Sequence, residues 1–197
     1  MSDGLTEARR GTYFTDRSYK LHFLNKPQIF WFTGLPQSGK STIAEKLHKT
    51  FENEYHKSFI LDGDLIRDGL NSNLAFSDAD RLENLRRAAE VGKIIYNLGY
   101  SVFGAFITPS EKSRKMISKI LPEVKFIYID TPLEICEERD TRGMYKLARE
   151  GKIADFTGID APFEIPKNPW MTITSIYNIE TISDNIIKKL KEDHGAF

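Results

Sequence analysis

The stretch that most constrains the fold is a glycine-rich segment directly after a short apolar run. Residues 28–42 read QIFWFTGLPQSGKST. The aromatic and β-branched residues at 29–32 are typical of a buried strand. The pattern G-x-x-x-x-G-K-[ST] then has every fixed position filled, by Gly34, Gly39, Lys40 and Ser41. Apolar residues recur every four positions beyond it, at 43, 47 and 51, which predicts a helix. Strand, glycine loop and helix are the context that this motif requires.

The chemistry of the segment explains its residue types. Glycines let backbone N–H groups turn around a polyphosphate at a helix N-terminus, where the helix dipole favours anions. Lys40 can reach the β- and γ-phosphates of ATP, and the Ser41 hydroxyl can ligate Mg²⁺. Gln37 stands at a variable position, where only the backbone amide matters. The predicted nucleotide-binding residues of the loop are Gly34, Gln37, Ser38, Gly39, Lys40, Ser41 and Thr42. The loop leaves the acceptor of any transferred phosphoryl group open.

Composition limits the partners and the compartment. With 28 basic and 28 acidic residues the net charge is zero, so there is no electrostatic footprint of a nucleic-acid or membrane binder. The single cysteine, Cys136, excludes an internal disulfide framework and fits a reducing compartment. The sequence has no run of 18 apolar residues and no hydrophobic signal-peptide core, so we expect a cytoplasmic protein. Residues 1–27 are polar and predict an N-terminal arm before one domain over 28–197.

Strand and helix patterns alternate along the rest of the chain. Apolar runs predict a buried strand at 58–61, further strands at 102–108 and 124–130, and an alternating edge strand at 171–177. Helices are predicted over 78–98, 110–121 and 132–138, and a closing helix is marked by residues 182–190. In the long helix, Asp78 is the expected cap, Gly99 closes it, and the apolar face is Leu82, Leu85, Ala89, Ile94 and Leu98. This alternation predicts an α/β fold with a mainly parallel sheet covered on both faces, and ligands outside the carboxyl ends of its strands.

Two aspartates follow the predicted strand at 58–61. Asp62 and Asp64 are the close carboxylate pair that this rule places beside the glycine loop. Phosphoryl transfer needs charge neutralisation and a group that accepts the proton of the attacking hydroxyl. One aspartate can organise Mg²⁺ while the other hydrogen-bonds the hydroxyl. The alternative is an Asp-Gly-Asp turn without a chemical role.

Residues beyond this pair predict an anionic, flat acceptor. Arg67 lies three residues after Asp64, and Arg81 and Asn84 share one face of the long helix. Two arginines near carboxylates in a chain of zero net charge suggest bidentate binding of an anion. Phe76 and Phe156 can stack on a flat ring. Taken singly, each arginine also fits a solvated surface position and each phenylalanine a core position.

The segment from 139 to 170 has no strand pattern and no long apolar periodicity. It carries basic side chains at Arg139, Arg142, Lys146 and Arg149, and the aromatic side chain of Phe156 further on. A structureless run of this length inside a compact domain is usually functional or disordered. We interpret it as a lid that closes on substrate and excludes water, the alternative being a mobile loop with solvated charges.

The segments LDGDLIRDGLNSNLAFSDADRLENLRR, AFITPS and RDTRGMYKLAREGKIADFTGIDAP resemble the adenylyl-sulfate kinase (APS kinase) family, over about residues 28 to 192. The resemblance implies a three-layer P-loop kinase fold, a homodimer and a role in sulfate assimilation. The implied reaction transfers the γ-phosphoryl group of ATP to the 3′-hydroxyl of adenosine 5′-phosphosulfate (APS), which gives PAPS and ADP. Asp62 and Asp64 fall on the catalytic and Mg²⁺-organising aspartates, with Asp64 favoured as the base, and Arg139 falls at the nucleotide end of the lid. The positions implied to bind APS are Arg67, Phe76, Arg81, Asn84, Ile107, Thr108, Arg142 and Phe156.

Several positions depart from the usual pattern of the family. Leu65 replaces asparagine, Asp68 replaces histidine, Arg142 replaces lysine and Thr108 replaces serine, while Ala75 replaces glycine. The first three surround the acceptor, so they bear on its identity more than on the reaction type. The nearest rival is therefore a kinase of the same fold acting on another nucleotide-like hydroxyl acceptor. A regulatory protein that binds nucleotide without transfer is disfavoured by the retained lysine, serine and aspartates, and a GTPase switch by the lack of an N-K-x-D motif.

Overall fold

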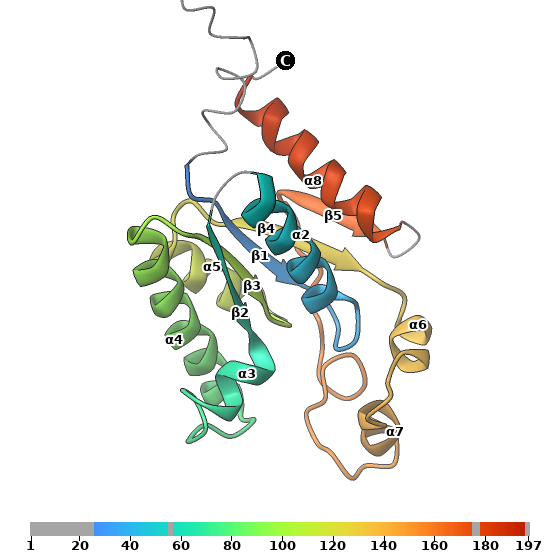
Figure 1. Cartoon of the computed structure of the whole chain (residues 1–197). Coiled ribbons are helices and arrows are strands. Elements are labelled where there is room, and N and C mark those ends of the chain that lie inside the picture. Colours follow the sequence, from blue (N-terminus) through green and yellow to red (C-terminus); the bar gives the residue numbers. More distant parts are fainter. Residues whose placement is uncertain (1–25, 55–56, 175–177, 196–197) are drawn as a thin grey trace, which may run out of the picture.

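A five-stranded parallel sheet forms the centre of the computed structural model, which describes residues 26–54, 57–174 and 178–195 (Figure 1). The strand order is β2-β3-β1-β4-β5, and every pairing is parallel. The strands are β1 (Ile29–Thr33), β2 (Ser58–Asp62), β3 (Ser101–Ala105), β4 (Lys125–Asp130) and β5 (Met171–Thr174). The predicted arm, apart from residues 26 and 27, and residues 175–177 of the last predicted strand lie outside the described residues.

Helices cover both faces of the sheet, which confirms the predicted three-layer α/β architecture. Helices α2 (Lys40–Glu54) and α8 (Ile179–Asp193) pack on one face, and α4 (Asp78–Asn97) and α5 (Glu111–Ile120) on the other (Figure 1). Successive side chains of a strand point to opposite faces. Accordingly Phe30 and Phe32 enter the core beneath α2 and α8, while Ile29 and Trp31 enter the core beneath α4 and α5. Short helices α3 (Gly63–Asp68), α6 (Leu133–Glu138) and α7 (Met144–Arg149) lie toward the carboxyl ends of the strands.

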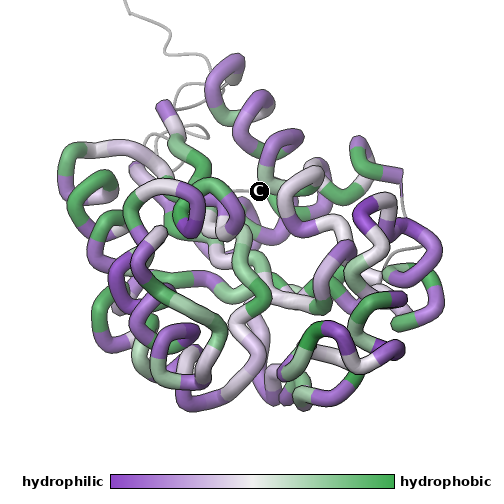
Figure 2. Tube along the Cα trace, turned by 90° about the horizontal axis from the view of Figure 1, so that it is seen from below, coloured by the Kyte–Doolittle hydropathy of each residue, from purple (hydrophilic) through white to green (hydrophobic). Residues whose placement is uncertain are grey.

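Most predicted elements are confirmed, with small shifts at their ends. Ser110 caps α5 by accepting a hydrogen bond from the Ser113 N–H, and β5 occupies a sheet edge as predicted. Strand β3 is fully buried but ends at Ala105, before the predicted Thr108. Figure 2 shows hydrophilic and hydrophobic segments alternating along the helices, as expected of helices with one buried face.

Three predictions about local structure are wrong. Strand β2, which was predicted to be buried, is the other edge of the sheet, and its Phe59 is 49% exposed. Ser77, not Asp78, caps α4, because its hydroxyl accepts the hydrogen bond from the Asp80 N–H. The buried face of α4 excludes Ile94 and Leu98, which are exposed, and consists of Asn84, Leu85, Ala88, Ala89 and Gly92.

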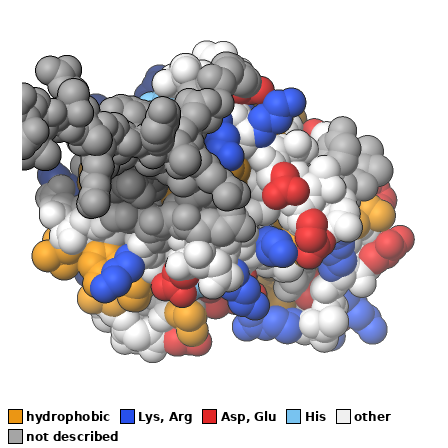
Figure 3. All heavy atoms as spheres, turned by 45° about the horizontal axis from the view of Figure 1, so that its top comes forward, with side chains coloured by type: hydrophobic (Ala, Val, Ile, Leu, Met, Phe, Trp, Pro, Cys, Tyr) orange, Lys and Arg blue, Asp and Glu red, His pale blue; other side chains and the backbone are white. Residues whose placement is uncertain are grey.

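Two further features concern the surface charge and the hydrophobicity of the helices. Lysines and arginines are interspersed with aspartates and glutamates on the face shown in Figure 3. Within the described ranges, none of the helices has both the length and the apolar character needed to cross a bilayer.

Candidate active site

One cavity of about 830 Å³ at the carboxyl ends of the strands brings the predicted site residues together. Its wall comes from the glycine loop after β1, from α3 after β2, from the turn after β3, from the start of α4 and from the segment after α6. The predicted residues that line it are Gln37, Ser38, Gly39, Lys40, Ser41, Thr42, Asp62, Asp64, Arg67, Phe76, Arg81, Asn84, Ile107, Thr108, Arg139, Arg142 and Phe156.

Gly34 is the one predicted nucleotide-binding residue that does not line this cavity. Its φ of +155° lies outside the range that side chains favour, and a Cβ there would stand 2.7 Å from the Ile129 carbonyl oxygen. Its N–H donates to the Ile107 carbonyl at 3.3 Å. Gly34 therefore shapes the start of the loop and ties it to the end of β3.

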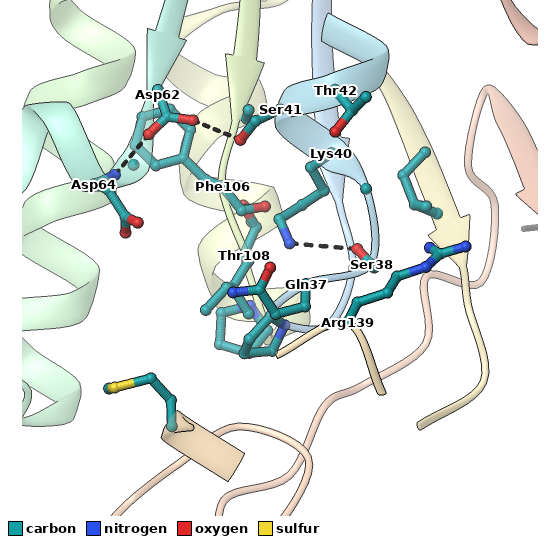
Figure 4. A pocket seen from close by; sticks show the side chains of 18 of the residues that line it. Gln37, Ser38, Lys40, Ser41, Thr42, Asp62, Asp64, Phe106, Thr108 and Arg139 are labelled. Carbon is teal, nitrogen blue, oxygen red and sulfur yellow. Dashed lines mark hydrogen bonds between the residues drawn. The ribbon is translucent and has the colours of Figure 1, made fainter. Parts of the chain in front are cut away.

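Lys40 begins α2 and is buried, with its ammonium folded onto the glycine loop (Figure 4). Its Nζ donates to the Leu35 carbonyl at 2.5 Å and to Ser38 Oγ at 3.3 Å. Burial lowers the pKa of Lys40 to about 8, because desolvation disfavours the charged form. The ammonium group of Lys40 is thus desolvated and hydrogen-bonded to two oxygen atoms of the glycine loop. Phosphate oxygens of a bound nucleotide can take the place of these two acceptors.

Ser41 and Asp62 connect the glycine loop to β2. The Ser41 hydroxyl donates to Asp62 Oδ2 at 2.6 Å, and Asp62 Oδ1 accepts the Asp64 N–H at 2.9 Å (Figure 4). Asp62 is therefore also the N-cap of α3, a short helix that the sequence analysis did not predict. A hydroxyl and one carboxylate fit a P-loop Mg²⁺ site, since that ion takes its other ligands from phosphates and water. Ser41 and Asp62 are therefore the candidate protein ligands; no group of three or more His, Cys, Asp or Glu side chains that could hold a metal is found among the described residues.

Asp64 lies in the first turn of α3 and faces the segment that was interpreted as a lid. Its Oδ2 accepts a hydrogen bond from Arg142 Nη1 at 2.8 Å, across 78 residues of sequence. The two side chains are 74% and 64% exposed, so solvent screens the pair and its contribution to stability is small. The contact nevertheless joins the acceptor side of the cavity to the lid segment.

Two guanidinium groups surround the exposed ring of Phe76. Arg67 Cζ lies 4.6 Å from the ring centroid and Arg81 Cζ lies 5.9 Å from it. Burial and the charge of Arg81 lower the pKa of Arg67, which is the effect expected where positive charge accumulates. Arg81 also reaches the lid segment, donating to the Asp155 carbonyl and to Thr157 Oγ1. These contacts form a positively charged patch that suits an anion.

The lid segment is more ordered than predicted, because it contains α7. Tyr145 of this helix is buried, and its hydroxyl donates to the Pro36 carbonyl of the glycine loop at 2.9 Å. Phe156 packs edge-on against Tyr145, with ring centroids 4.9 Å apart. Arg139 lies beside the glycine loop, since a Cβ on Gly39 would stand 3.9 Å from its Nη1. The segment is therefore anchored to the glycine loop, and Tyr145 is a site residue that sequence reasoning missed.

The turn after β3 forms the floor of the cavity in a strained conformation. Thr108 has a φ of +49°, which is unfavourable for a β-branched residue. Its Oγ1 accepts the Trp31 indole N–H at 2.8 Å, and its carbonyl accepts a hydrogen bond from buried Arg114 at 3.1 Å. Thr33 Oγ1 donates to the Ile107 carbonyl at 2.6 Å. Surrounding contacts thus hold the strained turn in place.

Comparison with known proteins gives consistent similarities. Residues 26–174 match the family model described as adenylylsulphate kinase. Adenylyl-sulfate kinase from Marinobacter nauticus is 46% identical over 170 residues, 85% of each chain. Adenylyl-sulfate kinase from Clostridium kluyveri is 45% identical over 163 residues, 82% of this chain and 81% of that one. The structure of the Mycobacterium tuberculosis APS kinase CysC in complex with AMPPNP and APS superposes with a TM-score of 0.81 at 38% identity, covering 84% of this chain and 98% of that one.

Proposed function

This chain belongs to the adenylyl-sulfate kinase family, and from that premise we propose that it transfers the γ-phosphoryl group of ATP to the 3′-hydroxyl of APS, giving PAPS and ADP. The observation that carries the proposal is one cavity with a phosphate-binding loop at one end and an arginine-lined patch at the other. The two ends meet at Asp62 and Asp64, which hydrogen-bond to Ser41 and to Arg142 respectively. Family membership supplies the identity of the two substrates.

On the nucleotide side, we assign the binding of the triphosphate to the amides of residues 37–42 and to Lys40. The positive end of the α2 dipole and the buried ammonium both stabilise negative charge that moves onto the leaving phosphate oxygens. Ser41 and Asp62 would hold Mg²⁺, which when bound neutralises charge on the β- and γ-phosphates. Arg139 would contact the nucleotide from the lid side.

On the acceptor side, Asp64 is the proposed base for the attacking hydroxyl. Its carboxylate is exposed to the cavity, so it can accept a proton in the step in which the hydroxyl oxygen attacks phosphorus. Arg67 and Arg81 would hold the phosphosulfate group, and Phe76 would stack on the adenine. Arg142 and the lid would exclude water, which favours transfer to the hydroxyl over hydrolysis of ATP.

A second acceptor class is kept as an alternative by one observation. Asp68 lies on α3, is exposed and lines the cavity, whereas Leu65 on the same helix is 72% exposed and does not line it. A kinase of the same fold acting on another nucleotide-like hydroxyl would differ at such positions.

The test is ADP release by the full chain with Mg²⁺ and ATP, with product identified by chromatography. We expect turnover with APS and formation of PAPS, and far less ADP with AMP or CMP. An APS analogue without the 3′-hydroxyl is the matched control and should give no phosphorylated product. No turnover with APS, together with turnover of another nucleotide, would replace the proposed acceptor.

We further propose that the enzyme works as a cytoplasmic homodimer. The proposed compartment rests on the single cysteine, which fits a reducing environment, and the proposed dimer rests on the family resemblance. Light scattering at several protein concentrations tests the dimer, and a mass of one chain at all of them would exclude it.

A further inference from the structure

We propose that Asn71 is a positioning residue for the acceptor site, which fixes the side-chain amide of Asn84 so that its N–H₂ group faces the cavity. Asn71 lies in the connection between α3 and α4, is 0% exposed and does not line the cavity. Asn84 is 4% exposed and does line it. Burying an amide is costly unless it is hydrogen-bonded, so the hydrogen-bond partners of Asn71 indicate its role.

The hydrogen bonds determine which way each amide points. Asn71 Nδ2 lies 3.3 Å from the backbone carbonyl of Asn84, an atom that can only accept, so this end of the Asn71 amide must be the donor. The same Nδ2 lies 2.8 Å from the side-chain oxygen of Asn84. A donor at this place selects the oxygen of Asn84 and leaves its Nδ2 on the opposite side. Among the described residues no hydrogen bond to that Nδ2 is found, and Asn84 lines the cavity, so we assign the N–H₂ group to the cavity side.

Asn71 is itself held firmly. Its N–H donates to the Ile66 carbonyl of α3, and its carbonyl accepts the Leu74 N–H, both at 2.9 Å. Its Oδ1 faces Arg87 Nη1 at 3.5 Å, and a donor there agrees with the assigned orientation. The same Nη1 is bound more closely by Asn73 Oδ1 at 2.9 Å. The loop thus presents one fixed donor to Asn84 and cannot readily turn it around.

The consequence concerns the substrate. Asn84 lies one helical turn after Arg81, on the same face of α4, so its N–H₂ group adds a neutral donor beside the positive patch. Such a donor binds an acceptor atom of the bound nucleotide and disfavours a ligand that presents a donor there. This step rests on the proposed function, since it takes APS as the ligand at this end of the cavity.

A double-mutant cycle tests the assignment. Asn71→Ala, Asn84→Ala and the double variant are compared with the wild type for the KM of APS, the KM of ATP and kcat. Loss of one net hydrogen bond predicts a rise in the KM of APS of about 3- to 10-fold for Asn71→Ala, with the KM of ATP unchanged. In the Asn84→Ala background the same substitution should change the KM of APS by less than about 1.5-fold, because Asn71 acts through Asn84. Asn73→Ala is the matched control, since it removes the neighbouring contact to Arg87 and leaves Asn84 untouched.

An isosteric variant provides a second readout. Asn71→Asp places an acceptor where the donor stands, so Asn84 should turn its N–H₂ group toward position 71 and its oxygen toward the cavity. The KM of APS should therefore rise more than in Asn71→Ala. An effect of Asn71→Ala that persists in the Asn84→Ala background, equal changes in the KM of ATP, or loss of folding in both Asn71 variants would overturn the inference. Wild-type turnover of APS is measured first, so that failure of the proposed function is seen separately.

Discussion

Replacing Asp64 by asparagine should separate the two halves of the proposed reaction. The substitution keeps the size of the side chain and removes its charge and its ability to accept a proton. In the structure the carboxylate contacts Arg142 of the lid segment, whereas Asp62 contacts Ser41 of the phosphate loop. We therefore expect Asp64→Asn to lose phosphoryl transfer while retaining ATP binding.

The expected magnitudes differ widely between catalysis and stability. A positioned general base contributes about 10²- to 10⁴-fold to the rate, which is about 3 to 5 kcal/mol at 1.36 kcal/mol per factor of ten. The ion pair that is lost joins side chains that are 74% and 64% exposed. Such exposed pairs contribute about 0.2 to 1 kcal/mol, so Tm should fall by no more than about 4 °C. The dissociation constant of ATP should stay within about twofold of the wild-type value.

The assay combines coupled ADP release with calorimetric titration of ATP in the presence of Mg²⁺. Asp62→Asn is the matched comparison. It also removes one carboxylate charge, but from the side chain that accepts the hydrogen bond from Ser41, two residues before Asp64. That variant should weaken ATP binding as well as turnover. If Asp64→Asn weakened ATP binding as much as it slowed transfer, Asp64 would belong to the metal side and the assignment of the base would be refuted.

Two further predictions concern buried groups in and beneath the cavity. Burial lowers the pKa of Lys40 from 10.5 to about 8 in the folded protein, so between these pH values the unfolded chain binds more protons and folding stability rises with pH. Lys40→Met should therefore raise Tm most below pH 8 while weakening ATP binding and turnover, and an unchanged Tm at pH 7 would contradict the burial argument. Thr108→Val leaves the Trp31 indole N–H without its partner and should lower the free energy of unfolding by about 1 to 3 kcal/mol in urea denaturation. Thr108→Ser keeps the hydroxyl and should lose far less, so equal losses for the two variants would refute the role of the hydrogen bond.

The sheet and the phosphate loop could be predicted from sequence because their signals are local. An apolar run, a fixed motif and a helical repeat each lie within about fifteen residues of chain. Whether a strand lies at the edge or in the centre of a sheet depends on the order of the strands, which a local sequence pattern does not encode. The run at 58–61 is as apolar as a central strand, yet β2 is paired on one side only and Phe59 is exposed. Sequence reasoning also placed the aspartate pair at the correct strand end without foreseeing α3.

The error in α4 has a geometrical cause. Residues advance by about 100° each around a helix, so Ile94, nine positions after Leu85, lies about 180° away from it. The position that continues the buried face is Gly92, which has no side chain to count as apolar. A Cβ at Gly92 would meet Leu61 and Val102 at 3.3 and 3.5 Å, so the helix packs closely on the sheet there. A search for apolar side chains therefore cannot identify a buried position that is occupied by glycine.

Helix α7 was missed for a related reason. Its six residues, MYKLAR, span less than two helical turns, so they are too few to show an apolar repeat, although Tyr145 and Ala148 are buried. The helix is fixed instead by long-range contacts: the Tyr145 hydroxyl binds Pro36, and the Tyr145 N–H binds the Asp140 carboxylate. Asn71 was missed in the same way, because a buried amide in a loop gives no sequence signal until its partner Asn84 is placed in space.

Strand order explains why the two halves of the cavity meet where they do. β3 lies between β1 and β2, so the phosphate loop and the aspartate pair start from strands about 10 Å apart, two strand spacings. That gap accommodates a phosphoryl group only if the intervening end of β3 stays below it. The turn at Ile107 and Thr108 is bound to Gly34 and Thr33 on one side and to Trp31 and Arg114 beneath. We therefore expect the unfavourable φ of Thr108, which is maintained by buried hydrogen bonds from β1 and α5, to keep this turn clear of the space between the glycine loop and the aspartate pair.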